Sequence, residues 1–326
     1  MISNHFSLEE VEQIIKQTAP WKAAGEDGLP LGLLKACDVV VIPKPNKTQA
    51  QLSLAGSWRP ISLLSTVGKI MEAAIARRLA DTAETHLLLP EGQMGNRPRR
   101  STELAVHIVA EMARTAWDRR GVASLLQLDL KGAFDRVDHT CLLQALKGRG
   151  IPKWLLDWIR SFVSNRKARL LFDGDASAPL SIHAGVPQGS PLSPILFLFY
   201  IAPLYDALEA TAGTILVGFA DDSNILAFGW ARAVGAEFEP AKSELVHFTR
   251  ARVPPQTCVR LGNTTIAPSE SSRFLGVWLH RKLQWGPHLK QIRTKFQRQR
   301  VALTALAASA WGCRLPRARE IYTPRR

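Results

Sequence analysis

Two short apolar runs separated by a pair of acidic residues constrain this chain most. Residues 214–228 read TILVGFADDSNILAF, a pattern that predicts a β-hairpin with Asp221 and Asp222 at its tip. Residues 123–130 read ASLLQLDL and predict a second apolar strand, with Asp129 near its C-terminal end. Carboxylates on buried strands are costly unless they are paired, hydrogen-bonded or bound to a metal ion. The fold therefore has either to expose these three acids or to bring them a cation.

The metal interpretation requires that Asp129 lie beside the hairpin tip, so that three carboxylates converge on one point. Hard oxygen ligands of this kind suit Mg²⁺, and two such ions can activate a hydroxyl and stabilise the leaving oxygen of an in-line displacement. The alternative is a solvated turn, which is what an Asp-Asp pair in a hairpin usually forms. The acids by themselves leave both interpretations open.

A loop rich in proline and glycine is the second unusual feature. Residues 185–194 read GVPQGSPLSP, which excludes a helix or a central strand there. Such a loop allows the backbone to approach a ligand closely, and Gln188 can both donate and accept hydrogen bonds. A rigid connector is the alternative. At the end of the loop, Ser193 followed by proline predicts the N-cap of a buried helix.

The charge of the chain is strongly positive and is concentrated at one end. Lys and Arg number 42 and Asp and Glu 28, which gives a net charge of +14. Residues 281–326 hold 12 of the basic residues and one acid, Glu320. A surplus of this size favours a polyanionic partner such as nucleic acid. A solvated basic helix or a disordered tail is the alternative for this segment.

Composition argues against several other classes of protein. The four cysteines have no near neighbours in the sequence, so we expect neither a zinc site nor a disulfide framework. The longest apolar run, residues 195–202, is far shorter than the roughly 20 residues of a membrane span. The opening residues do not form a signal peptide. We therefore expect a protein that is neither secreted nor embedded in a membrane.

Periodicity and turn residues predict the remaining elements. A helix begins at Ser7, which has Glu10 three residues later as in a capping box. Further helices are predicted over 67–79, 103–116 and 154–163, from about Phe134, and after Arg281. Strands are predicted over 39–42 and 274–279, and a hairpin pairs 168–172 with 180–183.

Seven segments, in this order, closely resemble the successive blocks of reverse transcriptases from LINE-type (non-LTR) retrotransposons. They are WRPISLLSTVGKIMEAAIARRL from Trp58, EGQMGNRPRRST from Glu91, LQLDLKGAFDRVDH from Leu126, GVPQGSPLSPILF from Gly185, GFADD from Gly218, AKSELVHF from Ala241 and FLGVWL from Phe274. The resemblance covers the chain from about Phe6 onward. Another two-metal phosphotransferase would not account for the GVPQGSPLSP loop or the FLG block.

The resemblance implies an α+β fold, a right-hand polymerase whose antiparallel palm sheet is backed by helices. It implies an N-terminal helical lead-in at 1–25 and a reverse transcriptase domain at 26–280, with fingers at about 26–122 and palm at about 123–280. Residues 281–326 would be a truncated, basic, helical thumb. The implied activity copies retrotransposon RNA into DNA from a DNA primer and dNTPs, with two Mg²⁺ ions for which Mn²⁺ can substitute.

The resemblance also implies roles for individual residues. It assigns catalysis to Asp129, Asp221 and Asp222 as metal ligands, with the backbone carbonyl of Leu130, and to Lys242 as general acid towards pyrophosphate. It assigns nucleotide binding to Phe134, whose ring would exclude a ribose 2′-hydroxyl, and to Gln188, Gly189 and Arg59. It assigns primer and template contacts to Phe274, Leu275, Gly276, Arg97, Arg99 and Arg100. Without the resemblance, Phe134 reads as core and these cations as solvated side chains.

The sequence departs from the family pattern in two places. Helices expected before residues 39–42 and after Gly229 are missing, and the chain stops early. We therefore expect either a decayed copy of an element or a gene model that has skipped coding sequence. A catalytically inactive remnant that retains at most nucleic-acid binding is the alternative function. The family implies location in the nucleus, otherwise the cytoplasm.

Overall fold

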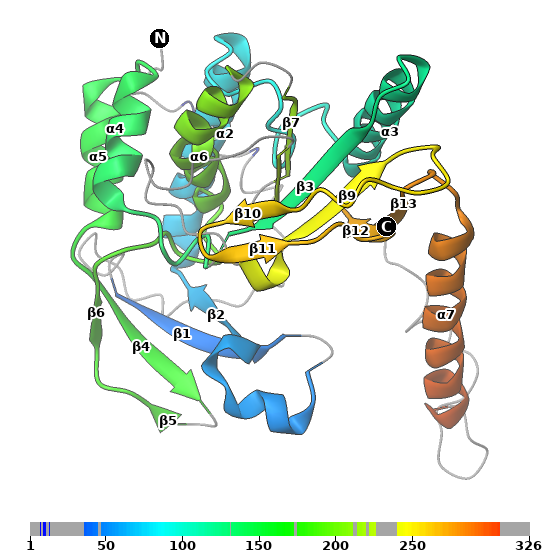
Figure 1. Ribbon diagram of the computed structural model, residues 1–326. Coiled ribbons are helices and arrows are strands. Elements are labelled where there is room, and N and C mark those ends of the chain that lie inside the picture. The colour runs from blue at the N-terminus through cyan, green and yellow to red at the C-terminus, as the bar shows by residue number, and fades with distance from the viewer. Residues whose placement is uncertain are drawn as a thin grey trace. The chain divides into compact units, whose positions relative to one another are not determined.

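The computed structural model describes most of the chain, which divides into two units (Figure 1). The described residues are 7, 9, 10, 13, 36–44, 47–130, 132–172, 175–210, 214–219, 222–225 and 240–306. The first unit comprises Met1–Ala105, Leu126–Ser243 and Val259–Ile266, and the second comprises Val106–Leu125, Glu244–Cys258 and Ala267–Arg326.

A mixed five-stranded sheet lies in the first unit. Its strands are β1 (Ala36–Pro43), β2 (Trp58–Leu63), β4 (Arg166–Phe172), β5 (Asp175–Ala176) and β6 (Leu180–Ile182). Strand β1 pairs antiparallel with β2 and parallel with β4, and both β5 and β6 pair antiparallel with β4. The predicted hairpin is confirmed in part, because Ala168 of β4 faces Leu180 of β6, whereas Leu171 and Phe172 pair with β5. Pro60 lies on the edge strand β2, where a missing N–H is tolerated.

The helices of this unit surround one buried helix, α6 (Ser193–Glu209). Twelve of the 17 residues of α6 are buried, as its apolar sequence requires, because a helix that is apolar on all sides belongs in the interior. Helices α2 (Thr66–Thr85) and α4 (His139–Gly148) contact α6, and α5 (Lys153–Val163) contacts α4 (Figure 1). The predicted helices over 67–79 and 154–163 are therefore confirmed.

An antiparallel sheet carries the predicted acids. Its strands in the first unit are β7 (Leu216–Phe219), β8 (Asp222–Ile225) and β3 (Ala123–Asp129), in the order β7-β8-β3. Helix α6 contacts β7, and the contact is close, because a Cβ on Gly218 would lie 2.4 Å from the Tyr205 ring. The hairpin and the strand predicted around Asp129 are both confirmed, as is a sheet backed by a helix. The unit also contains the turns η2 (Gln49–Ser53), η3 (Ala55–Ser57) and η5 (Pro240–Lys242), and the hairpin β10 (Val259–Leu261) and β11 (Thr264–Ile266).

The second unit contains the C-terminal part of α3 (Thr102–Asp118) and the first three residues of β3. Strand β9 (Glu244–Phe248) adjoins these residues, and His247 Nδ1 lies 2.8 Å from Ser124 Oγ. A hairpin of β12 (Ser271–Phe274) and β13 (Val277–His280) precedes the helix α7 (Gly286–Leu306). Val246, Phe248 and Phe274 are buried in this unit.

Three predictions of local structure were wrong. The helix expected from Phe134 begins at His139, because the carbonyls of Phe134 and Val137 accept hydrogen bonds from the loop at residues 185–186 and Asp138 caps the helix instead. The cap of α6 is Leu192 rather than Ser193, whose hydroxyl donates to the carbonyl of Pro187.

The strand expected over 274–279 is the centre of the β12–β13 hairpin. The chain turns at Leu275 and Gly276, which have φ values of +46° and +88°. Glycine supplies that left-handed conformation without strain.

Several predictions fall on residues outside the described part of the chain. They concern the lead-in at 1–25, apart from the hydrogen bond from Glu10 N–H to Ser7 Oγ, and the missing helix after Gly229. Among the helices of the described residues, none is both long and apolar enough to cross a membrane.

Candidate active site

Two of the predicted carboxylates lie on neighbouring strands of the antiparallel sheet. Asp129 is the last residue of β3 and Asp222 the first of β8, and the two face each other across the ladder. Residues directly opposite in such a ladder place their side chains on one face, with Cβ atoms about 5 Å apart. Asp221 belongs to the connection between Phe219 and Asp222 and lies outside the described residues. The fold thus brings Asp129 to the hairpin that carries the acid pair.

A basic side chain already lies against one of these carboxylates. Lys242 Nζ is 3.0 Å from Asp129 Oδ2, and the two side chains are 58% and 32% exposed. A partly exposed ion pair of this kind contributes little to stability. The ion pair matters for the chemistry of the site, because it places a positive charge on the face that Asp129 and Asp222 share. Two carboxylates on one face are a donor set that fits a hard divalent ion. Leu130, with a buried side chain, follows directly.

The turn that follows β3 is joined to the proline-rich loop by backbone hydrogen bonds. Val186 N–H donates to the carbonyl of Phe134, and Gly185 N–H donates to that of Val137, both at 2.8 Å. Gly185 has a φ of +85°, and a Cβ there would lie 2.7 Å from the carbonyl oxygen of Asp135. Only glycine fits this close approach. The two segments are therefore bonded to each other, a contact that the sequence did not reveal.

Gln188 is held from two sides. Its Nε2 donates to Asp135 Oδ1 at 2.9 Å, and its carbonyl accepts from Ser62 N–H on β2 at 2.7 Å. Gly189 has a φ of +115°, and a Cβ on it would lie 2.8 Å from the carbonyl oxygen of Ser62. A cavity of about 210 Å³ opens here, lined by Gln188, Asp135, Ser62 and Arg166 among others. The loop thus presents a polar side chain beside a cavity.

The order of these elements and their chemistry match one known family. A family model for "Reverse transcriptase (RNA-dependent DNA polymerase)" matches residues 42–279, well over half of the chain. The chain belongs to the reverse transcriptase family. The resemblance to reverse transcriptases of LINE-type retrotransposons is thereby confirmed, and the relatives below carry the names of such elements.

Two curated relatives of this chain carry the names of Drosophila mobile elements. The probable RNA-directed DNA polymerase from transposon X-element of Drosophila melanogaster is 31% identical over 280 residues, which cover 79% of this chain and 30% of the relative. The RNA-directed DNA polymerase from mobile element jockey of Drosophila funebris is 28% identical over 354 residues, covering 93% of this chain and 38% of the relative. The chain thus spans about a third of the length of these relatives.

Solved structures confirm the fold class of this chain. Telomerase from Candida tropicalis, in complex with a fragment of telomeric RNA, matches with a TM-score of 0.53 at 13% identity. The match covers 77% of this chain and 44% of the telomerase chain. The apo telomerase of the same organism matches with a TM-score of 0.52 over 85% of this chain and 51% of that chain. The right-hand polymerase fold of the α+β class was therefore predicted correctly.

The other residues predicted to bind nucleotide are Phe134 and Arg59, and each lies next in sequence to, or a few residues from, a partner of Gln188. Phe134 is half-buried and stacks on Phe197 of α6, with ring centroids 5.2 Å apart and ring planes at 29°. Core packing thus accounts for part of its surface and leaves the rest accessible. Arg59 is exposed on β2, three residues before Ser62.

A buried acid that the sequence analysis missed supports the same loop. Glu72 of α2 is only 6% exposed and accepts a hydrogen bond from Ser190 Oγ, which in turn accepts from Leu192 N–H at 3.1 Å. Burial raises the pKa of Glu72 to about 7, although Ser190, Arg166 and Lys69 each act to lower it. The sequence could have indicated this acid, because Glu72 shares a helix face with the apolar residues Ile75 and Leu79, and a buried acid on such a face requires a partner.

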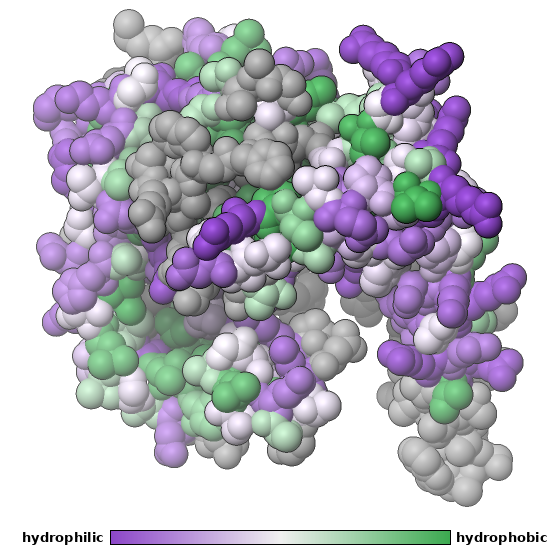
Figure 2. All heavy atoms as spheres, in the orientation of Figure 1, coloured by the Kyte–Doolittle hydropathy of each residue, from purple (hydrophilic) through white to green (hydrophobic). Residues whose placement is uncertain are grey.

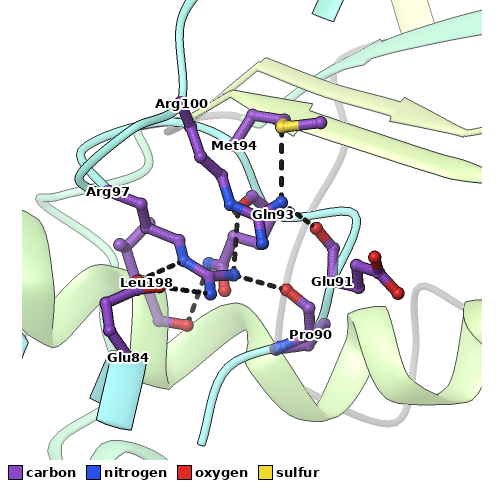
Figure 3. Close-up of polar contacts among 8 residues, drawn as sticks. All are labelled: Glu84, Pro90, Glu91, Gln93, Met94, Arg97, Arg100 and Leu198. Carbon is purple, nitrogen blue, oxygen red and sulfur yellow. Dashed lines mark hydrogen bonds and ion pairs between the residues drawn. The ribbon is translucent and has the colours of Figure 1, made fainter. Parts of the chain in front are cut away.

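The three arginines of the predicted template cluster have different environments. The Arg97 side chain is 2% exposed, and its guanidinium bonds to Glu84 and to backbone carbonyls (Figure 3). The prediction that Arg97 contacts the template is corrected, because a buried guanidinium occupied in this way is not presented to a nucleic acid. Arg100 is half-buried and donates to the carbonyl of Glu91, and burial lowers its pKa. Arg99 is exposed.

The predicted primer contact lies in the second unit. Phe274 is 1% exposed, so its ring belongs to the core of that unit, and only Leu275 and Gly276 at the turn offer backbone to a ligand. The face of α7 seen in Figure 2 is mostly hydrophilic in its described part, and the helix also exposes the apolar side chains Leu289, Ile292, Phe296 and Val301. Its exposed basic residues are Lys290, Arg293, Lys295, Arg298 and Arg300. These residues supply the positive surface that the charge distribution predicted.

Proposed function

We propose that this chain is the polymerase part of an RNA-directed DNA polymerase that copies retrotransposon RNA into DNA. One observation carries the proposal: Asp129 and Asp222 face each other on adjacent strands, and Lys242 lies 3.0 Å from Asp129. Membership of the reverse transcriptase family supports it. The substrates would be an RNA template, a DNA primer and dNTPs.

The carboxylates would hold two Mg²⁺ ions, or Mn²⁺ in their place. Asp129, Asp221 and Asp222 would supply side-chain oxygens, and Leu130 its backbone carbonyl. When bound, the ions would favour ionisation of the primer 3′-hydroxyl and neutralise charge on the leaving pyrophosphate. Lys242, already beside Asp129, would give a proton to that pyrophosphate.

The loop at Gln188 would bind the incoming nucleotide. Gln188 and Gly189 would offer backbone and amide groups beside the 210 Å³ cavity, and exposed Arg59 would meet the triphosphate. The accessible part of the Phe134 ring would exclude a ribose 2′-hydroxyl by contact. Because the turn carrying Phe134 is hydrogen-bonded to the loop carrying Gln188, the sugar and the base would be positioned together.

Nucleic acid would be held by the remaining basic and turn residues. Arg99 and Arg100 would contact the template, the turn at Leu275 and Gly276 the primer, and α7 the phosphates of the duplex. In this proposal the fingers are residues 26–122, the palm 123–280 and the thumb 281–326. Action on an element's RNA and a DNA primer would place the protein in the nucleus.

Primer extension tests the proposal. Purified protein is given a DNA primer on an RNA template, dNTPs and Mg²⁺, and wild type is compared with Asp222→Asn and with the exposed control Asp175→Asn. We expect synthesis by wild type and by the control, and about a hundred- to a thousandfold less from Asp222→Asn, since removal of an electrostatic catalytic group costs about 10²–10³ in rate. Salt-sensitive binding without any synthesis would instead support an inactive remnant.

A further inference from the structure

The buried Arg97 ties together the loop at residues 90–94. Its Nε and Nη2 donate to the two carboxylate oxygens of Glu84 at 2.6 and 3.0 Å. Its Nη1 donates to the carbonyls of Pro90 at 2.7 Å and of Gln93 at 3.1 Å (Figure 3). One guanidinium thus satisfies a carboxylate on the end of α2 and two carbonyls of the following loop. Only the planar fork of arginine reaches these acceptors together.

The loop fixed in this way lies along the outer side of β7. Met94 N–H donates to the carbonyl of Gly218 at 2.6 Å, and Gly218 N–H donates to the carbonyl of Gly92 at 2.9 Å. The side chain of Gln93 lies inside and donates to the carbonyl of Leu198 on α6 at 3.0 Å (Figure 3). Gln93 and Gly218 form a parallel bridge. The loop therefore acts as a short extra strand on the edge of the catalytic sheet.

The bonds continue from this edge to the carboxylates. Gly218 pairs with Ser223 of β8, and the next pair along the hairpin joins Phe219 to Asp222. Asp222 in turn faces Asp129 on β3. On its other side Gly218 lies against Tyr205, whose hydroxyl is 2.8 Å from Ser223 Oγ. The hairpin is thus held by α6 below and by the Arg97 loop at its edge.

We propose that Arg97 is a positioning residue that holds β7 through the loop at residues 90–94 and so keeps Asp222 opposite Asp129. The inference rests on the proposed polymerase function for its catalytic consequence. It assigns Arg97 a structural contact in place of a template contact, because the side chain is 2% exposed and its donors bond to Glu84 and to two loop carbonyls. Without Arg97, the carboxylate of Glu84 and the carbonyl of Gln93 lose the guanidinium as donor, and the carbonyl of Pro90 keeps only the Gln93 N–H at 3.3 Å. The cost of these lost hydrogen bonds favours opening of the loop.

The test compares Arg97→Lys and Arg97→Gln with wild type and with a control on the loop itself, Glu91→Gln, which replaces an exposed glutamate. Hydrogen exchange of the backbone amides of Met94 and Gly218 is measured in the full chain. We expect at least about tenfold faster exchange at both amides in the Arg97 variants, and unchanged exchange in α5 and in the control. Unchanged exchange at these amides would overturn the inference.

Kinetics separate positioning from template binding. We expect kcat for primer extension to fall by about 10- to 100-fold in the Arg97 variants, because displacement of a catalytic group by about 1 Å has that effect, while the Kd for template-primer stays within about twofold. A weaker Kd with unchanged kcat would overturn the inference and restore a template contact.

Two further experiments apply if a protein does not fold or is inactive. If Arg97→Gln does not fold, Glu84→Gln is used, which keeps the size of the partner side chain and removes its charge. We expect the same faster exchange at Met94 and Gly218 in this variant, and normal exchange would overturn the inference. If wild type itself makes no DNA, the proposed polymerase function fails, and hydrogen exchange alone decides whether Arg97 holds the loop.

Discussion

Replacement of the buried acid Glu72 by glutamine is expected to change how the stability of the protein depends on pH. Burial raises the pKa of Glu72 from 4.5 to about 7, against the opposing effects of Ser190, Arg166 and Lys69. Between these two pH values the unfolded chain is ionised at this position while the folded protein keeps the proton. The folded state therefore binds more protons, and the free energy of unfolding falls as pH rises through this window. Above about pH 7 the loss is complete.

The size of the effect follows from the width of the window. The rise of the pKa from 4.5 to about 7 corresponds to at most about 3 kcal/mol of stability, since a shift of one pKa unit is worth about 1.4 kcal/mol. Glutamine keeps an oxygen that accepts from Ser190 Oγ and has no ionisation to suppress. Glu72→Gln is therefore expected to be close to wild type in stability near pH 4.5 and more stable by up to about 3 kcal/mol at pH 8.

Urea unfolding followed by tryptophan fluorescence at both pH values gives these free energies. The control Glu91→Gln replaces an exposed glutamate and is expected to change the free energy by less than about 0.5 kcal/mol. The reasoning is refuted if Glu72→Gln and wild type respond to pH in the same way. A variant that is less stable than wild type at pH 8 would show that Glu72 is ionised and paired with Arg166.

Three other substitutions follow from the same structure. Gly189→Ala places a Cβ 2.8 Å from a backbone oxygen at a φ of +115°, so we expect the KM for dNTPs to rise at least about tenfold in steady-state primer extension; an unchanged KM would contradict a nucleotide contact by this loop. Gly218→Ala forces a methyl group into the Tyr205 ring and is expected to lower the free energy of unfolding by about 1–3 kcal/mol in urea, whereas an unaffected midpoint would contradict the packing of β7 on α6. Replacing both Lys290 and Arg293 by glutamine is expected to reduce the salt slope of template-primer affinity by about 2, measured by fluorescence anisotropy, and an unchanged slope would show that α7 does not contact phosphates.

The elements around the carboxylates were predictable because burial and turn chemistry act on short segments. Apolar runs on either side of Asp221 and Asp222 predict a hairpin. The apolar strand that ends at Asp129 pairs with the second strand of this hairpin. The ladder between β3 and β8 then follows from the need to bury both runs. The resemblance to reverse transcriptases added the order of the segments, which periodicity does not contain.

The predictions that failed depend on contacts between segments that are distant in the sequence. The helix expected from Phe134 does not begin there because carbonyls of that turn accept hydrogen bonds from Gly185 and Val186, some fifty residues away. Arg97 looks like a surface cation in a basic cluster and is buried only because Glu84 and the loop at residues 90–94 surround it. No local pattern reports such partners.

Binding of Mn²⁺ tests the central claim most directly, because it asks whether Asp129 and Asp222 act together on a cation without requiring DNA synthesis. Electron paramagnetic resonance of Mn²⁺, titrated into the protein with template-primer and a dNTP, gives the affinity for wild type, Asp129→Asn, Asp222→Asn and the exposed control Asp175→Asn. The account predicts that each of the first two substitutions weakens Mn²⁺ binding at least about tenfold and that the control does not, since loss of one carboxylate ligand removes a large part of the local negative charge. Equal affinity in all four proteins would contradict it.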